Sequence, residues 1–594
     1  MIWDGDCHFC GRWIERWREM TEGRVDYERF QTAAEKFPEI PRDEFEKAVQ
    51  FVETDGQVFR AAEAVYRSLG YSRHHRFLAW LYDHVPGVAP ISEGIYSLIA
   101  AHRVFASKVT RLLWGEDVRR PTYFAARRLF LRALGLVYLV AFISFWVQAD
   151  GLIGANGISP VSQFLPAAKE QIGARAHFFL PTLCWFNWSD AFLHLLCGTG
   201  VAVSIALILG LVPILCLIVL FVFYLSLTVA GQTFFNFQWD ILLLETGFLA
   251  MFFAPMTWRM TAKREAPFSR IGFFLLQLLL FKLMFMSGVV KLTSGDDSWW
   301  KLTALDYHYW TQPLPTVLGW WGAQTSEWLK HFCTFAVLFV ETLVPFLIWA
   351  PRRLRLVGFV LFVSLQFMIA LTGNYCFFNL LTIALCFLLL DDTQIARQRS
   401  ATVLDRRYRN WIPALVLIVT LPVNAFLIYS AVTPESQWPR PILALYSRIE
   451  PFRIVNGYGL FRVMTKERAE IVIEGSEDGN TWLEYEFKWK PGDVKRAPGW
   501  VAPHQPRLDW QMWFAALSDY QQNPWFVRFV RQLLKNSPEV TGLLERNPFP
   551  RNPPRYVRAI LYDYHFTTAT ERAITGAWWK REERGIYLPR VSID

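Results

Sequence analysis

Two cysteines three residues apart stand near the N-terminus, in the run Asp4-Gly-Asp-Cys7-His8-Phe-Cys10. The apolar piece MIW precedes them and the amphipathic pattern FCGRWIERWREM follows, which predicts a short strand, a turn and a helix. A cysteine at a helix N-terminus has its thiolate stabilised by the helix dipole and by free backbone N–H groups. We therefore predict that Cys7 attacks a disulfide and that Cys10 resolves the mixed disulfide.

The charges beside this pair have opposite expected effects on its reactivity. His8, when cationic, would favour the Cys7 thiolate further, whereas Asp4 and Asp6 would oppose it electrostatically. The two aspartates also permit a phosphatase-like interpretation. That interpretation is weaker, because no downstream residues stand out as supports for phosphate and magnesium.

A metal site is the competing interpretation of the two thiols. Structural zinc normally needs a second pair of ligands, and the chain has no second CxxC. His74 and His75 are the residues that could complete a site. Redox chemistry is favoured over metal binding, and no metal site is predicted.

Five ionisable residues lie inside or beside apolar segments: Asp240, Glu245, Lys282, Lys291 and Glu341. Such residues are costly in hydrocarbon, so they pair with one another or face a polar cavity. A structural ion pair of Lys282 with Glu245 or Glu341 and a functional cavity are equally good explanations. Lys291 and Asp240 lie near segment ends, where snorkelling to the membrane surface is a simpler explanation.

The composition indicates a membrane core flanked by soluble parts. Of 594 residues, 53% are hydrophobic and 16% aromatic, above the usual soluble mixture, but 19% are charged. Nine apolar segments stand out, and the fourth and eighth are short enough to be re-entrant, which predicts eight or nine crossings. The segments are 131–147, 191–209, 211–230, 241–254, 271–290, 332–350, 357–372, 377–390 and 412–432.

The basic residues predict the orientation of these segments. With nine crossings, the dense basic clusters at 119–128, 259–270, 352–355 and 397–409 all fall on one side, which is the cytosolic side. The N-terminus shows no signal peptide and is expected in the cytosol, with the C-terminal domain outside. The net charge of +9 is then explained by topology and by anionic lipid headgroups, and no nucleic-acid function is predicted.

Three parts follow from these patterns. Residues 1–115 alternate strand-like pieces (MIW, VDYERF, AVQFVET, QVFR) with helical patterns and are expected to form a small α/β domain. Residues 120–432 form the multi-pass helical core. Residues 433–594 are expected to be α+β, with a hairpin of AEIVIEG and TWLEYEFKWK around SEDGN, a strand RYVRAILYDYHF and Trp-rich helices between them.

The opening IWDGDCHFC resembles that of the thiol–disulfide oxidoreductases named for their Asp-Cys-Cys signature. The resemblance implies a thioredoxin-like fold for residues 1–115. The sequence departs from the family in its very short leading strand and in His8, where proline or another small or polar residue is common.

Longer segments resemble the lipase maturation factor family over roughly residues 120–580. They are GLIGANGISP, FFNFQWDILLLETGFLA, FMSGVVKLTSGDDSWWKLTALDYHY, GNYCFFNLLTIALCFLLLDD, NPWFVRFVRQLLKNSPEVTGLLERNPF and PPRYVRAILYDYHF. The resemblance implies a membrane protein of the secretory pathway that helps secreted lipases fold into active homodimers, not a lipase. The chain has no GxSxG nucleophile elbow. Fusion to an N-terminal redox domain suggests a bacterial cytoplasmic membrane rather than the endoplasmic reticulum membrane.

The leading hypothesis is that the outward C-terminal domain binds an exported client protein, while Cys7 and Cys10 exchange thiols. The resemblance implies that such clients are secreted lipases. Because that pair faces the cytosol, client oxidation would need electrons to cross the membrane, through Cys184 and Cys376 or a lipid-soluble quinone. One alternative is a purely structural client-binding protein whose redox domain has lost its activity. The other is an integral membrane enzyme acting on a lipid or quinone. SGVVKL distantly resembles the segment around a catalytic lysine of vitamin K-dependent carboxylases, which would make Lys291 a base.

Overall fold

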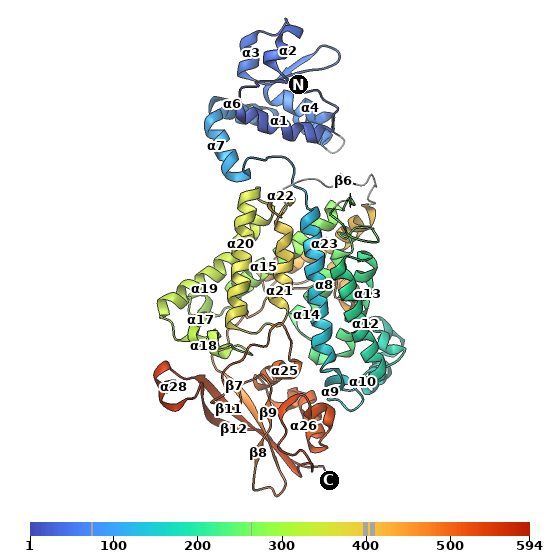
Figure 1. Cartoon of the computed structure of the whole chain (residues 1–594), viewed down its shortest axis with the longest axis vertical. Helices are drawn as coiled ribbons and strands as arrows, with labels where there is room; N and C mark the ends of the chain where they lie inside the picture. Colours follow the sequence, from blue (N-terminus) through green and yellow to red (C-terminus); the bar gives the residue numbers. More distant parts are fainter. Residues whose placement is uncertain (73–74, 263, 396–401, 404–409, 594) are drawn as a thin grey trace. The chain divides into compact units, whose positions relative to one another are not determined.

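The computed structural model describes residues 1–72, 75–262, 264–395, 402–403 and 410–593. The chain divides into two compact units (Figure 1). The first unit comprises residues 1–122 with 349–357 and 391–393, and the second comprises the rest of the chain. Much of the predicted basic cluster at 397–409 lies outside the described residues.

The first unit contains a four-stranded mixed sheet in the order β2-β1-β3-β4. The strands are β1 (Ile2–Trp3), β2 (Glu28–Arg29), β3 (Gln50–Val52) and β4 (Val58–Arg60). Strand β1 pairs parallel to β2 and antiparallel to β3, and β3 and β4 form an antiparallel hairpin. Each of the four pieces predicted to be strand-like contains one of these strands. The parallel β1–β2 pair requires a crossover, which α1 (His8–Thr21) provides.

Helices cover this sheet and extend the unit. They are α2 (Phe30–Ala33), α3 (Arg42–Lys47), α4 (Ala61–Gly70), α5 (Arg76–His84), α6 (Val88–Ala101) and α7 (Arg103–Trp114). Trp3 of β1, Ile14 of α1, Phe51 of β3 and Ala64 of α4 are buried in one apolar cluster. This packing fixes the start of α1, and with it the position of Cys7, against the sheet.

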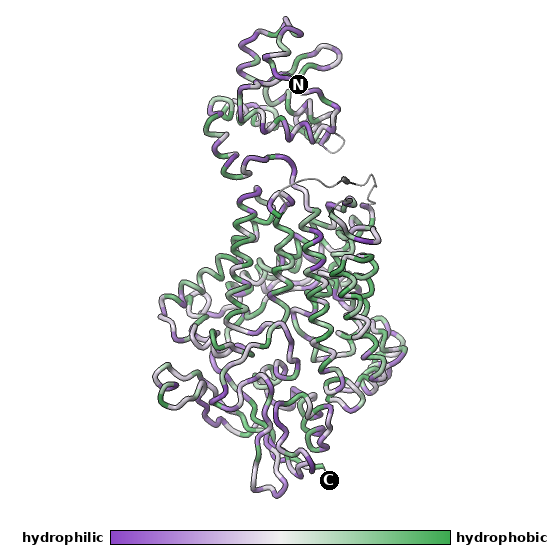
Figure 2. Tube along the Cα trace, viewed as in Figure 1, coloured by the Kyte–Doolittle hydropathy of each residue, from purple (hydrophilic) through white to green (hydrophobic). Residues whose placement is uncertain are grey.

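The second unit contains a bundle of apolar helices, shown as green segments in Figure 2. Among the described residues, six helices are long and apolar enough to cross a membrane. They are α8 (Phe124–Trp146), α12 (Asp190–Leu209), α13 (Pro213–Ala230), α15 (Arg270–Leu292), α20 (Arg352–Thr372) and α23 (Trp411–Val432). Each of them overlaps one predicted segment, as expected for a multi-pass membrane protein.

The other three predicted segments are also helical but shorter. They correspond to α14 (Gln238–Ala250), α19 (Glu327–Thr342, followed by a 3-10 turn at Val344–Trp349) and α21 (Phe378–Cys386). A helix of 13 residues spans about 20 Å, less than the hydrocarbon core of about 30 Å. The predicted count of eight or nine crossings is therefore unconfirmed. Short helices connect the spans, among them α10 (Val161–Ile172), α16 (Asp297–Trp300), α17 (Ala304–Thr311) and α18 (Val317–Ala323), and α24 (Arg440–Ile449) follows the last span.

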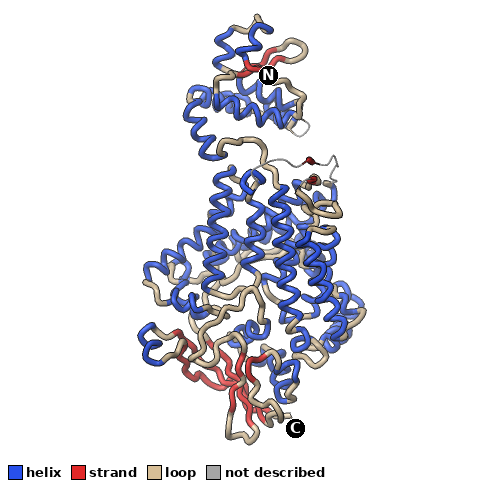
Figure 3. Tube along the Cα trace, viewed as in Figure 1, coloured by secondary structure: helices blue, strands red, loops and turns tan. Residues whose placement is uncertain are grey.

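Four strands of the C-terminal region form an antiparallel sheet in the order β12-β11-β7-β8, and the strands of this region are drawn red in Figure 3. The predicted hairpin is present as β7 (Ala469–Ser476) and β8 (Leu483–Glu484), and the predicted strand as β11 (Tyr556–Phe566). In the turn, Asp478 Oδ1 accepts the N–H groups of Asn480 (2.8 Å) and Thr481 (2.7 Å). Strand β12 (Trp579–Val591) was not predicted.

A second, two-stranded sheet and four helices complete this region. The strands are β9 (Glu486–Phe487) and β10 (Leu544–Arg546). The helices are α25 (Arg507–Ala516), α26 (Pro524–Leu534), α27 (Pro538–Thr541) and α28 (Ala569–Thr575).

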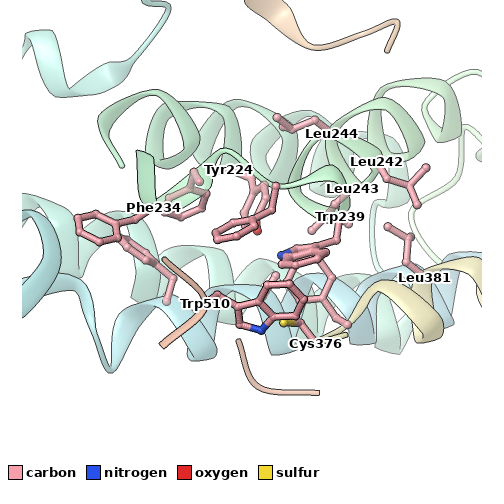
Figure 4. Packing of buried hydrophobic residues seen from close by; sticks show 14 of the residues in the cluster. Tyr224, Phe234, Trp239, Leu242, Leu243, Leu244, Cys376, Leu381 and Trp510 are labelled. Carbon is pink, nitrogen blue, oxygen red and sulfur yellow. The ribbon is translucent and has the colours of Figure 1, made fainter. Parts of the chain in front are cut away.

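The C-terminal region and the helical bundle share one hydrophobic core. Trp510 of α25 lies edge-on against Trp239 of α14, with ring centroids 4.7 Å apart, and both residues lie near Cys376 in Figure 4. Phe234 meets Trp525 of α26 at 5.8 Å. Aromatic pairs of this kind bury large apolar areas, so the two parts stabilise each other.

Candidate functional site

Cys7 occupies the N-cap of α1. Its sulfur accepts the backbone N–H of Cys10 at 3.3 Å, and its own N–H donates to the Asp4 carbonyl at 3.2 Å. Both cysteines are half-buried thiols. The strand, turn and helix predicted around the CxxC are therefore all present, and the first thiol lies where the helix dipole favours an anion.

The two thiols differ in acidity because of their positions. A hydrogen bond from the Cys10 thiol, the Cys10 backbone N–H and the charge of Arg103 lower the pKa of Cys7 to about 6, despite burial and Asp4. The hydrogen bond to Cys7, together with burial, raises the pKa of Cys10. Cys7 is thus largely thiolate at neutral pH and suited to attack, while Cys10 keeps its proton.

Arg103, the first residue of α7, supplies the positive charge that was expected from His8. Its guanidinium donates to the carbonyls of Glu46 (2.8 Å) and Lys47 (2.7 Å) and lies 3.5 Å from Asp4. His8 is exposed. Asp4 opposes the Cys7 thiolate as predicted, but it is held in place by Arg103 and by Gln31, whose amide donates to it at 3.0 Å.

Replacing Arg103 by glutamine is expected to raise the pKa of Cys7, because the positive charge that favours the thiolate is lost. The rate of iodoacetamide alkylation at pH 6 should fall by roughly two- to three-fold. Lys108→Gln removes the same charge from the same helix and is the matched control. An equal fall in both variants, or none in Arg103→Gln, would contradict the assignment of this role to Arg103.

Lys282 and Glu245 form a buried ion pair inside the bundle. Lys282 Nζ donates to Glu245 Oε1 at 2.6 Å and to Asn424 at 2.7 Å. Glu245 Oε2 accepts the backbone N–H of Asn456 (2.9 Å) and the hydroxyl of Tyr458 (2.8 Å). Of the two predicted partners, Lys282 therefore pairs with Glu245. The hydrogen bonds of this network link α14, α15, α23 and the segment after α24.

Asp240 pairs with a residue that the sequence did not suggest. Arg507, at the start of α25, donates from Nη1 to Asp240 Oδ2 (3.0 Å) and from Nη2 to Oδ1 (2.9 Å). The Tyr224 hydroxyl donates to the same carboxylate at 2.5 Å. Asp240 and Arg507 are both 0% exposed, so snorkelling is the wrong explanation for Asp240.

Lys291 pairs with Glu341, and its ammonium lies 5.2 Å from the centre of the Trp299 ring. Lys291 is 5% exposed, so it does not snorkel to the membrane surface either. The five ionisable residues, together with Arg507, thus form three separate buried pairs.

The remaining predicted cysteines and ligands form no site of their own among the described residues. Cys184 and Cys376 are buried thiols, and Cys376 lies near the Asp240–Arg507 pair. No group of three or more potential metal ligands occurs among the described residues. The Nδ1 atom of His75 lies 2.8 Å from the Ser72 hydroxyl, and His74 lies outside the described residues.

Three family models match the chain. A DCC1-like thiol-disulfide oxidoreductase model matches residues 1–109, a lipase maturation factor transmembrane domain model matches 125–397, and a lipase maturation factor C-terminal domain model matches 454–589. Lipase maturation factor 2 of Gallus gallus is 37% identical over 595 residues, which cover 81% of this chain and 82% of the relative. The chain belongs to the lipase maturation factor family.

Other family members match to a similar extent. Lipase maturation factor 2 of Homo sapiens is 35% identical, over 79% of this chain and 82% of the relative. Lipase maturation factor 1 of Bos taurus is 34% identical, over 80% of this chain and 90% of the relative. No solved structure matches the chain. These vertebrate relatives give no support to a bacterial membrane, and the comparisons give none to the carboxylase-like alternative.

Proposed function

We propose that this member of the lipase maturation factor family assists the folding of exported proteins, with secreted lipases as the client class, and couples this to thiol–disulfide exchange at Cys7 and Cys10. The observation that carries the proposal is the match to named lipase maturation factors over about four fifths of both chains. The thiol chemistry is supported by the DCC1-like match and by the N-cap position of Cys7.

The exchange reaction uses both cysteines and a partner disulfide. The Cys7 thiolate attacks one partner sulfur, the partner S–S bond breaks, and the departing thiolate takes up a proton. Cys10 then loses its proton and attacks Cys7 Sγ, which releases the second partner thiol. The partner is reduced by two electrons and the Cys7–Cys10 pair is oxidised. A cellular dithiol or a quinol must reduce the pair again, and the same steps in reverse would oxidise a partner dithiol.

The C-terminal region is the proposed client-binding part. Its sheet and helices pack on the bundle through Trp239 and Trp510 and through the Asp240–Arg507 pair, within one compact unit. With nine crossings and a cytosolic N-terminus, the C-terminal region would face the compartment into which clients are exported. A thioredoxin-like domain in residues 1–115 would then exchange thiols on the cytosolic side.

The orientation can be measured by thiol labelling in intact cells. Asn480→Cys places a thiol in the exposed β7–β8 turn, which should react with a membrane-impermeant maleimide added outside. Native Cys7 should react only after the membrane is made permeable. Labelling of Cys7 but not of residue 480 in intact cells would reverse the proposed orientation.

The function is tested by producing the chain with a secreted dimeric lipase in cells that lack their own lipase maturation factor. The wild-type chain should increase the ratio of lipase activity to lipase protein in the medium, and the Cys7→Ser, Cys10→Ser double variant should lower this gain. A ratio equal to that without the chain would refute the maturation role. A double variant equal to wild type would refute only its coupling to thiol exchange.

A further inference from the structure

A cavity of about 340 Å³ lies within the second unit, between α15, α17, α19, α20 and α21. Most of its walls are aliphatic or aromatic, from Leu283, Val337, Leu365, Ile369 and Phe378 among others. Ligand-binding cavities in proteins begin at about this volume and are mainly apolar, with a few polar groups that orient the ligand. This cavity is separate from the CxxC and from the Lys282–Glu245 and Asp240–Arg507 pairs.

The polar groups of the cavity gather around Lys291. Its ammonium contacts Glu341 and lies over the Trp299 ring. His308 Nε2 lies 3.1 Å from the Tyr375 hydroxyl, which itself donates to Gln312 at 2.8 Å. Burial and the charge of Lys291 lower the pKa of His308, on the short helix α17, to about 4, so its ring is neutral. The polar end of the cavity therefore carries no net charge.

The opposite side of the cavity reaches the surface of the bundle. Ser364 and Met368 of α20 line the cavity and are also exposed, Met368 to 56%. Helix α20 is one of the apolar helices long enough to cross a membrane. Exposed residues in the middle of such a helix face hydrocarbon, so an apolar chain can enter from the bilayer.

Phe461, from the segment after α24, closes the polar end. Its ring lies edge-on to His308 at 4.6 Å and to Tyr375 at 5.8 Å. The residue has a φ of +55°, a left-handed conformation that costs a non-glycine residue about 1 kcal/mol or more. Such strain persists only where the surroundings hold it, and here it places an aromatic ring against His308 and Tyr375 at the polar end of the cavity.

We propose that this cavity binds one uncharged lipid with a single long chain and an oxygen-bearing head group. The hydrocarbon chain of the lipid lies between α19 and α20, and its head group accepts a hydrogen bond from Lys291. The volume accommodates one chain at most, so the second chain of a phospholipid would have to remain in the bilayer. A carboxylate or phosphate head would add a buried negative charge beside Glu341, which already neutralises Lys291, and such a charge would be costly without a further cation.

Photoaffinity labelling of the full-length protein in lipid nanodiscs tests whether the cavity binds the hydrocarbon chain of a lipid. The probes are diazirine-bearing monoacylglycerol, fatty acid and diacyl phospholipid, and a photoreactive long-chain quinone, with the labelled peptides identified by mass spectrometry. Labelling of α19 and α20 by monoacylglycerol or by the quinone is expected, and the stronger of the two identifies the source of the ligand. A preference for the fatty acid or the phospholipid would overturn the proposal.

Two tryptophan substitutions provide the matched comparison. Val337→Trp fills the cavity from α19, whereas Val360→Trp places the same side chain on the exposed face of α20, outside the cavity. Labelling should fall at least ten-fold in Val337→Trp and stay within two-fold of wild type in Val360→Trp. Equal labelling of both would overturn the proposal. Ala336→Leu, a smaller filling of the same wall, replaces Val337→Trp if that variant does not fold.

The head group is tested by removing the ion pair as a unit. Lys291→Met with Glu341→Leu leaves no unpaired buried charge, and it should weaken binding of the uncharged probe by about ten-fold, as for loss of one hydrogen bond to a charged donor. Unchanged affinity of this folded double variant would overturn the assignment of the head to Lys291.

Discussion

Cys7→Ser is expected to abolish thiol–disulfide exchange by the N-terminal unit, whereas Cys10→Ser should accumulate a mixed disulfide with the partner. Only Cys7 has its pKa lowered, to about 6, and only the thiolate attacks a disulfide. Cys10 lies within hydrogen-bond reach of Cys7 and is the group that would release the partner. The exchange rate with a model disulfide should fall at least about a hundred-fold in Cys7→Ser, and trapped partners can be identified by mass spectrometry without reduction.

Cys333→Ser, which alters another half-buried thiol, is the control for general loss of cysteine and should leave exchange unchanged. Exchange retained by Cys7→Ser would show that Cys10 or another thiol attacks. Rapid release of the partner from Cys10→Ser would show that Cys10 does not resolve the intermediate.

Arg507→Met is expected to destabilise the second unit by about 3–5 kcal/mol, because it leaves the Asp240 carboxylate buried without its counter-charge. The guanidinium also donates to the Phe234 carbonyl at 2.6 Å and lies over the Phe235 ring at 3.5 Å, so the loss affects packing as well. The midpoint of thermal unfolding in nanodiscs, with the protease sensitivity of the C-terminal region, measures the effect.

The double variant Arg507→Met, Asp240→Leu removes both charges and should recover most of the lost stability. Arg558→Met is the matched control, because Arg558 pairs with Glu474 at a position where its side chain is 34% exposed, and its loss should cost about 1 kcal/mol or less. Similar losses for Arg507→Met and Arg558→Met would contradict the importance of the buried pair. So would a double variant as unstable as Arg507→Met.

The apolar helices could be predicted because the hydrophobicity of the sequence is sufficient to locate them. Helix α12 begins one residue before the predicted segment at 191–209 and ends with it. Strand β12 was missed because its sequence, WKREERGIYLPRV, alternates little and carries six charges, so it does not resemble a half-buried strand. It is held by pairing with β11, as at Phe566 and Trp579, which is a tertiary effect that local patterns do not contain.

Local spacing also explains which parts of the site were predictable. Cys7 and Cys10 could be identified because the strand, the motif and the helix are contiguous in the sequence. Arg103 could not, because it approaches the thiols from α7, almost a hundred residues later. Arg507 is 267 residues from Asp240, in a region whose sequence indicates a soluble domain. The sequence therefore offers no reason to pair Arg507 with Asp240.

The redox state of Cys7 and Cys10 in native membranes tests the proposed thiol exchange most directly, and it is measured by maleimide mass-tagging after equilibration over a series of dithiothreitol ratios. One reversible two-electron transition is expected, in which both thiols are lost and recovered together, and no transition is expected in Cys7→Ser. If both thiols remain alkylatable at every ratio, or oxidise independently of each other, the pair is not a redox couple and the proposed coupling of client maturation to thiol exchange is wrong.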